Sequence, residues 1–267
     1  MTTASWMAQL LQLDRDSDTF FAREPAGANQ DGRLFGGLIA AQSLAAATAT
    51  LEDADKLPQS LHAYFVRGGQ PEVDVELAVE RTRDGRSFAT RRVTALQSGK
   101  VIFEMLASFH VTEPGVDQHP PAPPMPPAAE CHELIGFGPS DRFEMRTPRD
   151  DGAFTGPPHW VRMREAVEDD PIIRACTLTY MSDMGLMAAA RPLNTPLRFG
   201  QPGFSAASLD HSVWFHRPFV PDRWHAYQAS PVNNVGSRGL AIGGLYDEAG
   251  TLVATMAQEA LWRLGDD

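Results

Sequence analysis

Two polar residues, Gln258 and Asp183, stand where the surrounding pattern favours apolar side chains. By the period-two alternation of a strand, Gln258 shares a face with Leu252, Met256 and Trp262. A side-chain amide on such a face needs hydrogen-bond partners, because burying it unpaired costs roughly a few kcal/mol. Either Gln258 bonds a backbone group in the core, or it faces an internal site.

Asp183 follows Ser182 at the start of a predicted helix over residues 183–190, DMGLMAAA. A carboxylate is stable at a helix start for structural reasons alone, since it faces the free N–H groups of the first turn. An earlier helical stretch begins instead with Gly36 and Gly37, whose backbone N–H groups can approach a ligand closely. One segment offers N–H donors and the other a proton acceptor, which together are what water activation needs.

The chain contains the same unit twice. Residues 60–67 read SLHAYFVR and residues 208–217 read SLDHSVWFHR. The matched residues are Tyr64-Phe65 with Trp214-Phe215, Arg67 with Arg217, Gly85 with Gly236, and Gly99 with Gly250. The same alignment places Phe35 opposite Asp183 and Ala107 opposite Gln258. A tandem duplication follows, and chemistry is expected where the copies diverge.

Each copy is predicted to be a helix followed by an antiparallel sheet. The stretch 36–51 is apolar nearly all round, which predicts a buried helix. Further predictions are a short helix at 5–13, a first strand at 19–23 with 142–146 in the same place in the second copy, strands at 73–79, 93–96 and 101–111, and hairpin turns at 97–100 and 247–250.

A proline-rich segment separates the copies. Prolines at the density found in residues 113–129 cannot form a helix or a central strand and predict a semi-rigid linker. The predicted domains are therefore residues 1–112 and 130–267. A single sheet running through both copies is the simplest way to protect their free edges.

The composition excludes several classes of function. The net charge of −11 argues against non-specific nucleic-acid binding. No apolar run is long enough for a membrane span, no secretory signal is evident, and two cysteines without metal or redox spacing suit a reduced cytoplasm. One arginine-rich stretch predicts either a solvated strand edge or an anion-binding patch; its members are Arg81, Arg83, Arg86, Arg91 and Arg92.

Other catalytic motifs are absent from the sequence. There is no G-x-S-x-G, G-x-G-x-x-G or G-x-x-x-x-G-K-[ST], and no metal site is predicted from His211 and His216, which lack thiolate or carboxylate partners in ligand spacing. Ser208 starts a predicted strand and by alternation shares a face with Ser212 and Trp214. A lone serine there usually caps a strand end.

Together these stretches resemble the type II acyl-CoA thioesterases. The matching segments are GRLFGG (32–37), HAYFVRGG (62–69), RDGRSFA (83–89), YMSD (180–183), LDHSVWFHRPF (209–219) and AQE (257–259), which follow the family's order along almost the whole chain. The resemblance implies an α+β tandem (double) hot-dog fold, in which each unit wraps a sheet around a long helix, and assembly into a homo-oligomer.

The resemblance also implies the site. In the family an Asp, a Thr or Ser, and a Gln hold the water that attacks the thioester, and these match Asp183, Ser208 and Gln258. Ser208 retains the hydroxyl but lacks the methyl that stiffens a threonine rotamer. Backbone N–H groups near Gly36 and Gly37 are expected to polarise the substrate carbonyl. Arg86 is the arginine selected, among several candidates, to bind the phosphates of coenzyme A. No metal or cofactor is required.

Two other functions compete with hydrolysis. Hot-dog acyl-CoA hydratases carry a G-D-x-N-P-[hydrophobic]-H signature, which this chain lacks. A duplicated hot-dog protein could instead bind acyl-CoA without turnover, although the Asp, Ser and Gln are retained. Acyl groups carried by a protein rather than by coenzyme A remain an open substrate class.

Overall fold

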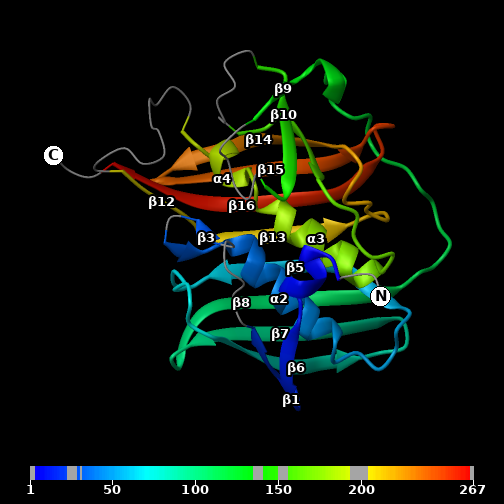
Figure 1. Ribbon diagram of the computed structural model, residues 1–267, viewed down its shortest axis with the longest axis vertical. Helices are drawn as coiled ribbons and strands as arrows, with labels where there is room; N and C mark the ends of the chain where they lie inside the picture. Colours follow the sequence, from blue (N-terminus) through cyan, green and yellow to red (C-terminus); the bar gives the residue numbers. More distant parts are fainter. Residues whose placement is uncertain are drawn as a thin grey trace.

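One antiparallel sheet curls around two central helices (Figure 1). The computed structural model describes residues 4–22, 29–30, 32–134, 141–149, 156–192 and 204–264. Within these ranges the sheet has 14 strands in the order β1-β2-β6-β7-β8-β5-β13-β16-β15-β14-β11-β10-β9, and β12 also pairs with β16. Because β5 pairs with β13, the sheet is continuous between the two copies, as predicted.

The first copy supplies one side of this sheet. Its strands are β1 (Leu13–Asp16), β2 (Thr19–Ala22), β5 (Lys56–Phe65), β6 (Val75–Asp84), β7 (Phe88–Gln97) and β8 (Lys100–Val111); a separate two-stranded sheet joins β3 (Asn29–Gln30) to β4 (Arg33–Leu34). The alternating run at 73–79 falls in β6, and the predicted turn at 97–100 joins β7 to β8. The short helix predicted at 5–13 is α1 (Trp6–Leu10).

The second copy repeats this order. Its elements are β9 (His132–Glu133), β10 (Phe143–Thr147), β11 (His159–Met163), α3 (Pro171–Ser182), α4 (Leu186–Ala189), β12 (Phe204–Ser208), β13 (Asp210–Phe215), β14 (His225–Val235), β15 (Arg238–Asp247) and β16 (Leu252–Leu264). One correspondence predicted from sequence is wrong. The segment 142–146 lies in β10, which corresponds to β1. The counterpart of β2 is β11, because β2 pairs with β6 and β11 pairs with β14, the equivalent strand of the second copy.

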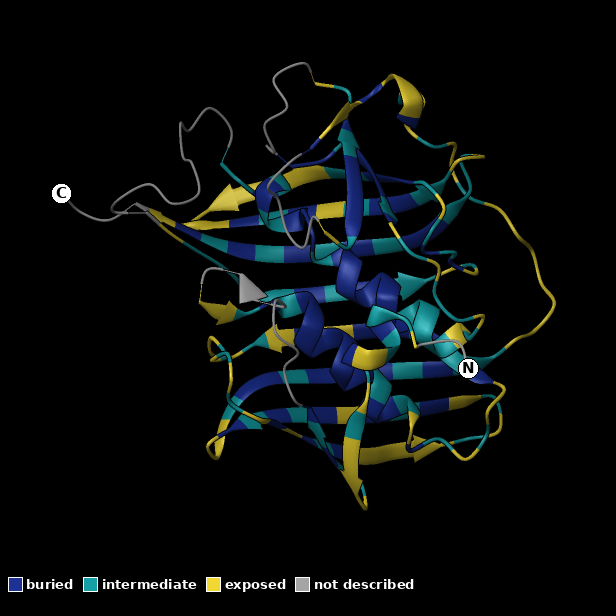
Figure 2. Cartoon of the chain, viewed as in Figure 1, coloured by how far each residue is buried: buried dark blue, intermediate teal, exposed yellow. Residues whose placement is uncertain are grey.

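The helix α2 (Gly36–Thr48) is buried on nearly all sides, as its apolar sequence predicts (Figure 2). It packs against α3 of the second copy. One polar member of α2, Gln42, is satisfied by donating a hydrogen bond of 2.9 Å to the carbonyl of Leu10 in α1. The centre of the molecule is therefore formed by both copies.

The main helix of the second copy differs from the prediction. It is α3, which begins after Asp170, whose carboxylate accepts hydrogen bonds from the N–H groups of Ile172 and Ile173, with Pro171 in the first turn. Asp183 is the residue that ends α3, and only the short α4 lies within the helix predicted at 183–190. Asp183 therefore does not begin the second buried helix.

A bulge at the junction of β12 and β13 shows that the predicted face of Ser208 is also wrong. Ser208 pairs with Ala260, whereas Ser212 pairs with Ala257, so one strand advances four residues while the other advances three. Such an extra residue reverses the side-chain alternation. Ser208 consequently lies on the opposite face from Ser212, and on the same face as Ala260 and Gln258.

The proline-rich segment forms neither helix nor strand from residue 113 to residue 127. It crosses the outside of the molecule as an exposed trace (Figures 1 and 2). Its C-terminal end is hydrogen-bonded to the second copy, since the indole N–H of Trp160 donates to the carbonyl of Pro126 at 2.8 Å. The 3-10 turn Ala128–Glu130 follows. With this connection, the arrangement is the α+β double hot-dog that the resemblance implies.

Candidate active site

Asp183 and Gln258 meet in the interior where the two copies join. The side-chain amide Nε2 of Gln258 donates a hydrogen bond of 2.9 Å to Oδ1 of Asp183. The backbone N–H of Gly37, in the first turn of α2, donates to the same carboxyl group. Asp183 thus lies at a helix N-terminus as its residue type favours, but the helix belongs to the other copy.

Glycines 36 and 37 allow this close approach. A Cβ atom added at Gly36 would lie 2.6 Å from Oδ2 of Asp183, and one added at Gly37 would lie 2.3 Å from the carbonyl oxygen of Tyr180. Neither distance is compatible with a side chain. The glycine pair predicted to approach a ligand therefore approaches the carboxylate of the second copy.

The environment of Asp183 allows its carboxyl group to exchange a proton near neutral pH. Loss of contact with water raises the pKa of Asp183 to about 7, and the hydrogen bonds from Gln258 and the Gly37 N–H oppose this rise by stabilising the carboxylate. The residue retains partial exposure. A carboxyl with this pKa exchanges protons in the range where general bases work best.

Gln258 is fully buried and has an amide oxygen directed at no donor among the described residues. Its Nε2 is already used by Asp183, so Oε1 remains able to accept a hydrogen bond. Ser208 lies diagonally across the ladder on the same face, through its pairing with Ala260. The structure therefore places Gln258, Gly36 and Gly37 next to Asp183. Ser208 lies on the same face of the sheet as Gln258.

Comparison with known protein families covers most of the chain. The model of the acyl-CoA thioesterase N-terminal domain matches residues 24–110, and that of the C-terminal domain matches residues 116–262. The chain belongs to the acyl-CoA thioesterase family. The resemblance found in the motifs is confirmed.

Individual relatives agree with the family. Human acyl-coenzyme A thioesterase 8 is 34% identical over 267 residues, covering 87% of this chain and 81% of the human protein. Acyl-CoA thioesterase 2 of Haemophilus influenzae is 31% identical and covers 97% of this chain and 98% of its own length. The crystal structure of the acyl-CoA thioesterase II TesB2 from Mycobacterium marinum matches with a TM-score of 0.83 and 33% identity, over 97% of this chain and 98% of that one.

The thioesterase chain also has buried polar residues behind Asp183 that sequence reasoning missed. The hydroxyl of Ser182 lies 2.8 Å from the carbonyl of Thr179 and 2.7 Å from Nε2 of His211, and the Tyr227 hydroxyl donates to the Ser182 carbonyl. Burial lowers the pKa of His211 to about 4, so its ring is neutral at physiological pH. The available signal was His211 in the LDHS stretch (residues 209–212), which alternation with Val213 places on the core face.

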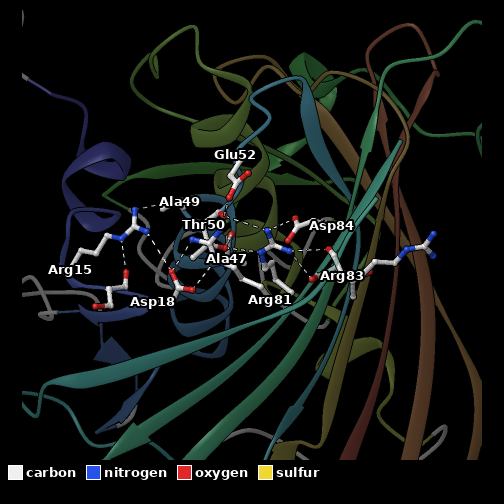
Figure 3. Close-up of polar contacts among 12 residues, drawn as sticks. Arg15, Asp18, Ala47, Ala49, Thr50, Glu52, Arg81, Arg83 and Asp84 are labelled. Atoms are coloured by element: carbon white, nitrogen blue, oxygen red, sulfur yellow. Dashed lines mark hydrogen bonds and ion pairs between the residues drawn. The ribbon is translucent and has the colours of Figure 1, made fainter. Parts of the chain in front are cut away.

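The arginine-rich stretch lies away from this thioesterase site. Arg91 is completely buried and anchors the end of α2, since its guanidinium donates to the hydroxyl and carbonyl of Thr50 and to the carboxylate of Asp84. Figure 3 labels these two partners, Thr50 and Asp84. Arg81 pairs with Asp18 at 2.8 Å. Arg86 is exposed in the turn that follows Asp84. The structure therefore separates Arg86 from Asp183 by the length of α2, whose 13 residues span roughly 20 Å.

Two classes of site find no support in the described ranges. No group of three or more His, Cys, Asp or Glu residues among them could hold a metal ion. No helix within those ranges is long and apolar enough to cross a membrane.

Proposed function

We propose that the protein hydrolyses the thioester bond of fatty acyl-CoA by direct attack of water, releasing a free fatty acid and coenzyme A. The observation that carries the proposal is the pairing of Asp183 with Gln258 at the N-terminal end of α2. Membership of the acyl-CoA thioesterase family supports the substrate class. The scheme needs neither a covalent enzyme intermediate nor a cofactor.

Asp183 acts as the general base. Its carboxylate takes a proton as the water oxygen bonds to the thioester carbon, which contributes a rate factor of about 10²–10⁴ in typical enzymes. Since its pKa is raised to about 7, the carboxyl group can return the proton to the departing thiolate. Gln258 and the Gly37 N–H keep a useful fraction of the group ionised.

Gln258 and Ser208 position the water. Oε1 of Gln258 accepts a hydrogen bond from one O–H of the water, while the other O–H points at Asp183. The Ser208 hydroxyl, on the same face of the sheet, supplies a further hydrogen bond to the water oxygen. Fixing the nucleophile in this way removes much of the entropic barrier to attack.

The first turn of α2 stabilises the oxyanion that forms on the substrate. The N–H groups of Leu38 and Ile39 both bond the carbonyl of Phe35, at 3.1 and 3.3 Å, and that of Gly37 bonds Asp183. The Gly36 N–H has no partner within the described ranges. Gly36 therefore donates to the developing oxyanion, an interaction worth about 2.7–4 kcal/mol in other hydrolases.

Substrate binding and assembly complete the proposal. The acyl chain occupies the apolar interior, and Arg86 is the candidate contact for the phosphates of coenzyme A. A cytoplasmic homo-oligomer is proposed because both cysteines, Cys131 and Cys176, are free thiols and because Tyr64, 65% exposed, and Leu106, 47% exposed, project from the outer face of the sheet. Light scattering after size-exclusion chromatography measures the assembly directly.

The proposal is tested by following thiol release from acyl-CoAs of short to long chain, with wild type and Asp183→Asn compared. Turnover that depends on chain length and falls at least about 100-fold in the variant supports both the reaction and the base. Unchanged turnover in Asp183→Asn would retain the reaction and reject the site. A folded wild type that binds acyl-CoA without releasing thiol would point to the binding-protein alternative.

A further inference from the structure

The bulge between β12 and β13 is held by a side chain that the proposed reaction does not use. The carboxylate of Asp210 accepts a hydrogen bond of 2.6 Å from the backbone N–H of Glu259. The N–H of Leu209 donates to the carbonyl of the same Glu259 at 2.9 Å. Both peptide groups of Glu259 are therefore fixed by the bulge.

These contacts adjoin two residues of the proposed site. Glu259 directly follows Gln258, and Leu209 directly follows Ser208. The bulge turns Ser208 onto the face of Gln258, because the residues after it have the opposite alternation. The relative position of the serine hydroxyl and the glutamine amide thus depends on how this short stretch is held.

The first copy shows what the bulge requires. There, Pro58 pairs with Phe109 and Ser60 with Ser108, so the same extra residue is present. Ser60 occupies the place of Asp210 in the repeat alignment. A carboxylate is consequently unnecessary for forming the bulge. Only the second copy, which contains the polar site, has a carboxylate at this position.

Stability alone does not account for Asp210. Aspartate is unfavourable in strands. Partial burial disfavours its ionised form and raises its pKa, and the negative charge of Glu259 adds to this, although the hydrogen bond from the Glu259 N–H opposes the rise. The carboxylate also lies on the outer side of the sheet, because the next residue, His211, is completely buried on the core face. It therefore cannot reach the reacting atoms itself.

We infer that Asp210 is a positioning residue of the hydrolytic site, which holds Ser208 in register with Gln258 through the backbone of Glu259. The inference rests on the proposed function, since it assigns Asp210 to the placement of the attacking water. Asp210 acts through its neighbours and does not contact substrate.

The test compares Asp210→Ala, which removes the acceptor, with Asp210→Asn, which keeps an oxygen in the same place. Steady-state thiol release from one acyl-CoA should show kcat lowered about 10- to 100-fold in Asp210→Ala, because a misplacement of about 1 Å costs up to about 10²-fold in rate. KM should be unchanged, and Asp210→Asn should retain kcat within about 3-fold, because an amide oxygen accepts the same N–H.

A matched control uses the opposite end of β16, the strand that contains Glu259. The carboxylate of Asp247 accepts the N–H of Thr251 at 2.8 Å in the turn before β16. Asp247→Ala loses an equivalent bond, so it should leave kcat unchanged. Asp210→Ser, which copies the residue of the first half, serves as a second folded variant if Asp210→Ala does not fold, and its kcat should also fall.

A double-mutant comparison separates this inference from the proposed function. Ser208→Ala tests the function's own use of the serine. The losses in Ser208→Ala and Asp210→Ala should combine to less than their product, because both disturb one element. Wild-type kcat in Asp210→Ala and Asp210→Ser, a change confined to KM, or losses that multiply fully would each overturn the role of Asp210 while leaving the hydrolase intact.

Discussion

The two copies share one scaffold so closely that their differences define the site. In the first, the N–H groups of Val66 and Arg67 both donate to the carbonyl of Ile102; in the second, those of His216 and Arg217 both donate to Val253. The guanidinium of each arginine also bonds the carbonyl one residue earlier, that of Val101 or Leu252. The alignment made from sequence is therefore structurally real.

Against this common frame, the polar residues fall in one copy only. The counterparts of Ser208 and Gln258 are Pro58 and Ala107, neither of which has a polar side chain. The predicted pairing of Asp183 with Phe35 is wrong, because Asp183 ends α3 whereas Phe35 precedes α2. Phe35 instead packs against Tyr180, with ring centroids 4.8 Å apart, and Ala107 is completely buried. Duplication thus allowed one position to become a polar site and the equivalent one to become core.

The first copy still contributes to the site through its helix end. Gly37 belongs to the first copy and Asp183 to the second, and the hydrogen bond between them crosses the junction. A helix N-terminus carries a partial positive charge, which stabilises a carboxylate that burial destabilises. In the proposed site, the first copy therefore supplies hydrogen-bond donors and the second copy supplies the base.

The largest expected effect comes from pushing the two copies apart. Gly37→Ala adds a Cβ that would lie 2.3 Å from the Tyr180 carbonyl, so α2 must move away from Asp183. We expect kcat to fall by about 100-fold, and the free energy of unfolding to fall by about 1–3 kcal/mol. Thiol release and chemical denaturation measure the two effects.

Gly115→Ala is the matched control for that substitution, since a Cβ there meets nothing within 4 Å. It should behave as wild type in both assays. Full activity in Gly37→Ala would show that the junction tolerates the displacement and that the Gly37 N–H is dispensable.

Making the second copy resemble the first should have the next largest effect. Gln258→Ala introduces the residue found at position 107 and removes the amide that donates to Asp183 and is proposed to position water. We expect kcat to fall about 10- to 100-fold. Because the lost hydrogen bond favours the ionised carboxylate, the pKa of Asp183 should rise, and the acidic limb of the kcat/KM profile should move to higher pH.

Gln97→Ala provides the comparison for this variant. Gln97 is another buried amide, whose Nε2 bonds the carbonyls of Gln70 and Val73 and has no contact with the site. Its loss should lower stability without moving the pH profile. An equal shift in both variants would indicate that the profile reports general loosening.

Much of the scaffold could be predicted because its signals are local. The alternation in residues 73–79, the glycine turn at Gly99 and the apolar run of α2 each report their structure within a few residues. The helix α3 was not predicted, because Thr177 and Thr179 interrupt its apolar pattern and β-branched residues disfavour helices. Its start was marked, however, by Asp170 followed by Pro171.

The site was only partly predictable because its geometry is non-local. The oddness of Asp183 and Gln258 could be recognised from the repeat, but their hydrogen bond joins residues 75 positions apart. The face of Ser208 was predicted wrongly by comparison with Ser212, since a single extra residue reverses the alternation. Bulges follow from pairing between strands, which the sequence of one strand does not contain.

A smaller effect concerns stability rather than rate. Asp183 has a folded-state pKa of about 7, above its ordinary value of 3.8, so the folded state binds the proton more tightly than the unfolded chain does. The contribution to stability is therefore present below about pH 4 and lost as pH rises through about 7. Asp183→Asn, which cannot ionise, should be inactive yet more stable than wild type at pH 8, with the gain much reduced at pH 5.

Urea denaturation at the two pH values measures this difference. A variant that is less stable than wild type at pH 8 would show that the carboxylate is fully compensated by Gln258 and the Gly37 N–H. The raised pKa would then not describe the free enzyme.

The smallest expected effect is that of Arg86→Ala, which tests whether the first copy also binds substrate at the far end of α2. Arg86 is exposed beyond the end of α2 that Arg91 fastens, roughly 20 Å from Asp183. An exposed arginine gains only about 0–1 kcal/mol from a solvated ion pair. Arg86→Ala should therefore raise KM for acyl-CoA less than about 3-fold, with kcat unchanged. Arg92→Ala, on the exposed outer face, is the matched loss of charge. If KM rose about 10-fold in Arg86→Ala alone, the nucleotide of coenzyme A would have to reach this turn, and the first copy would contribute phosphate binding as well as the helix N-terminus.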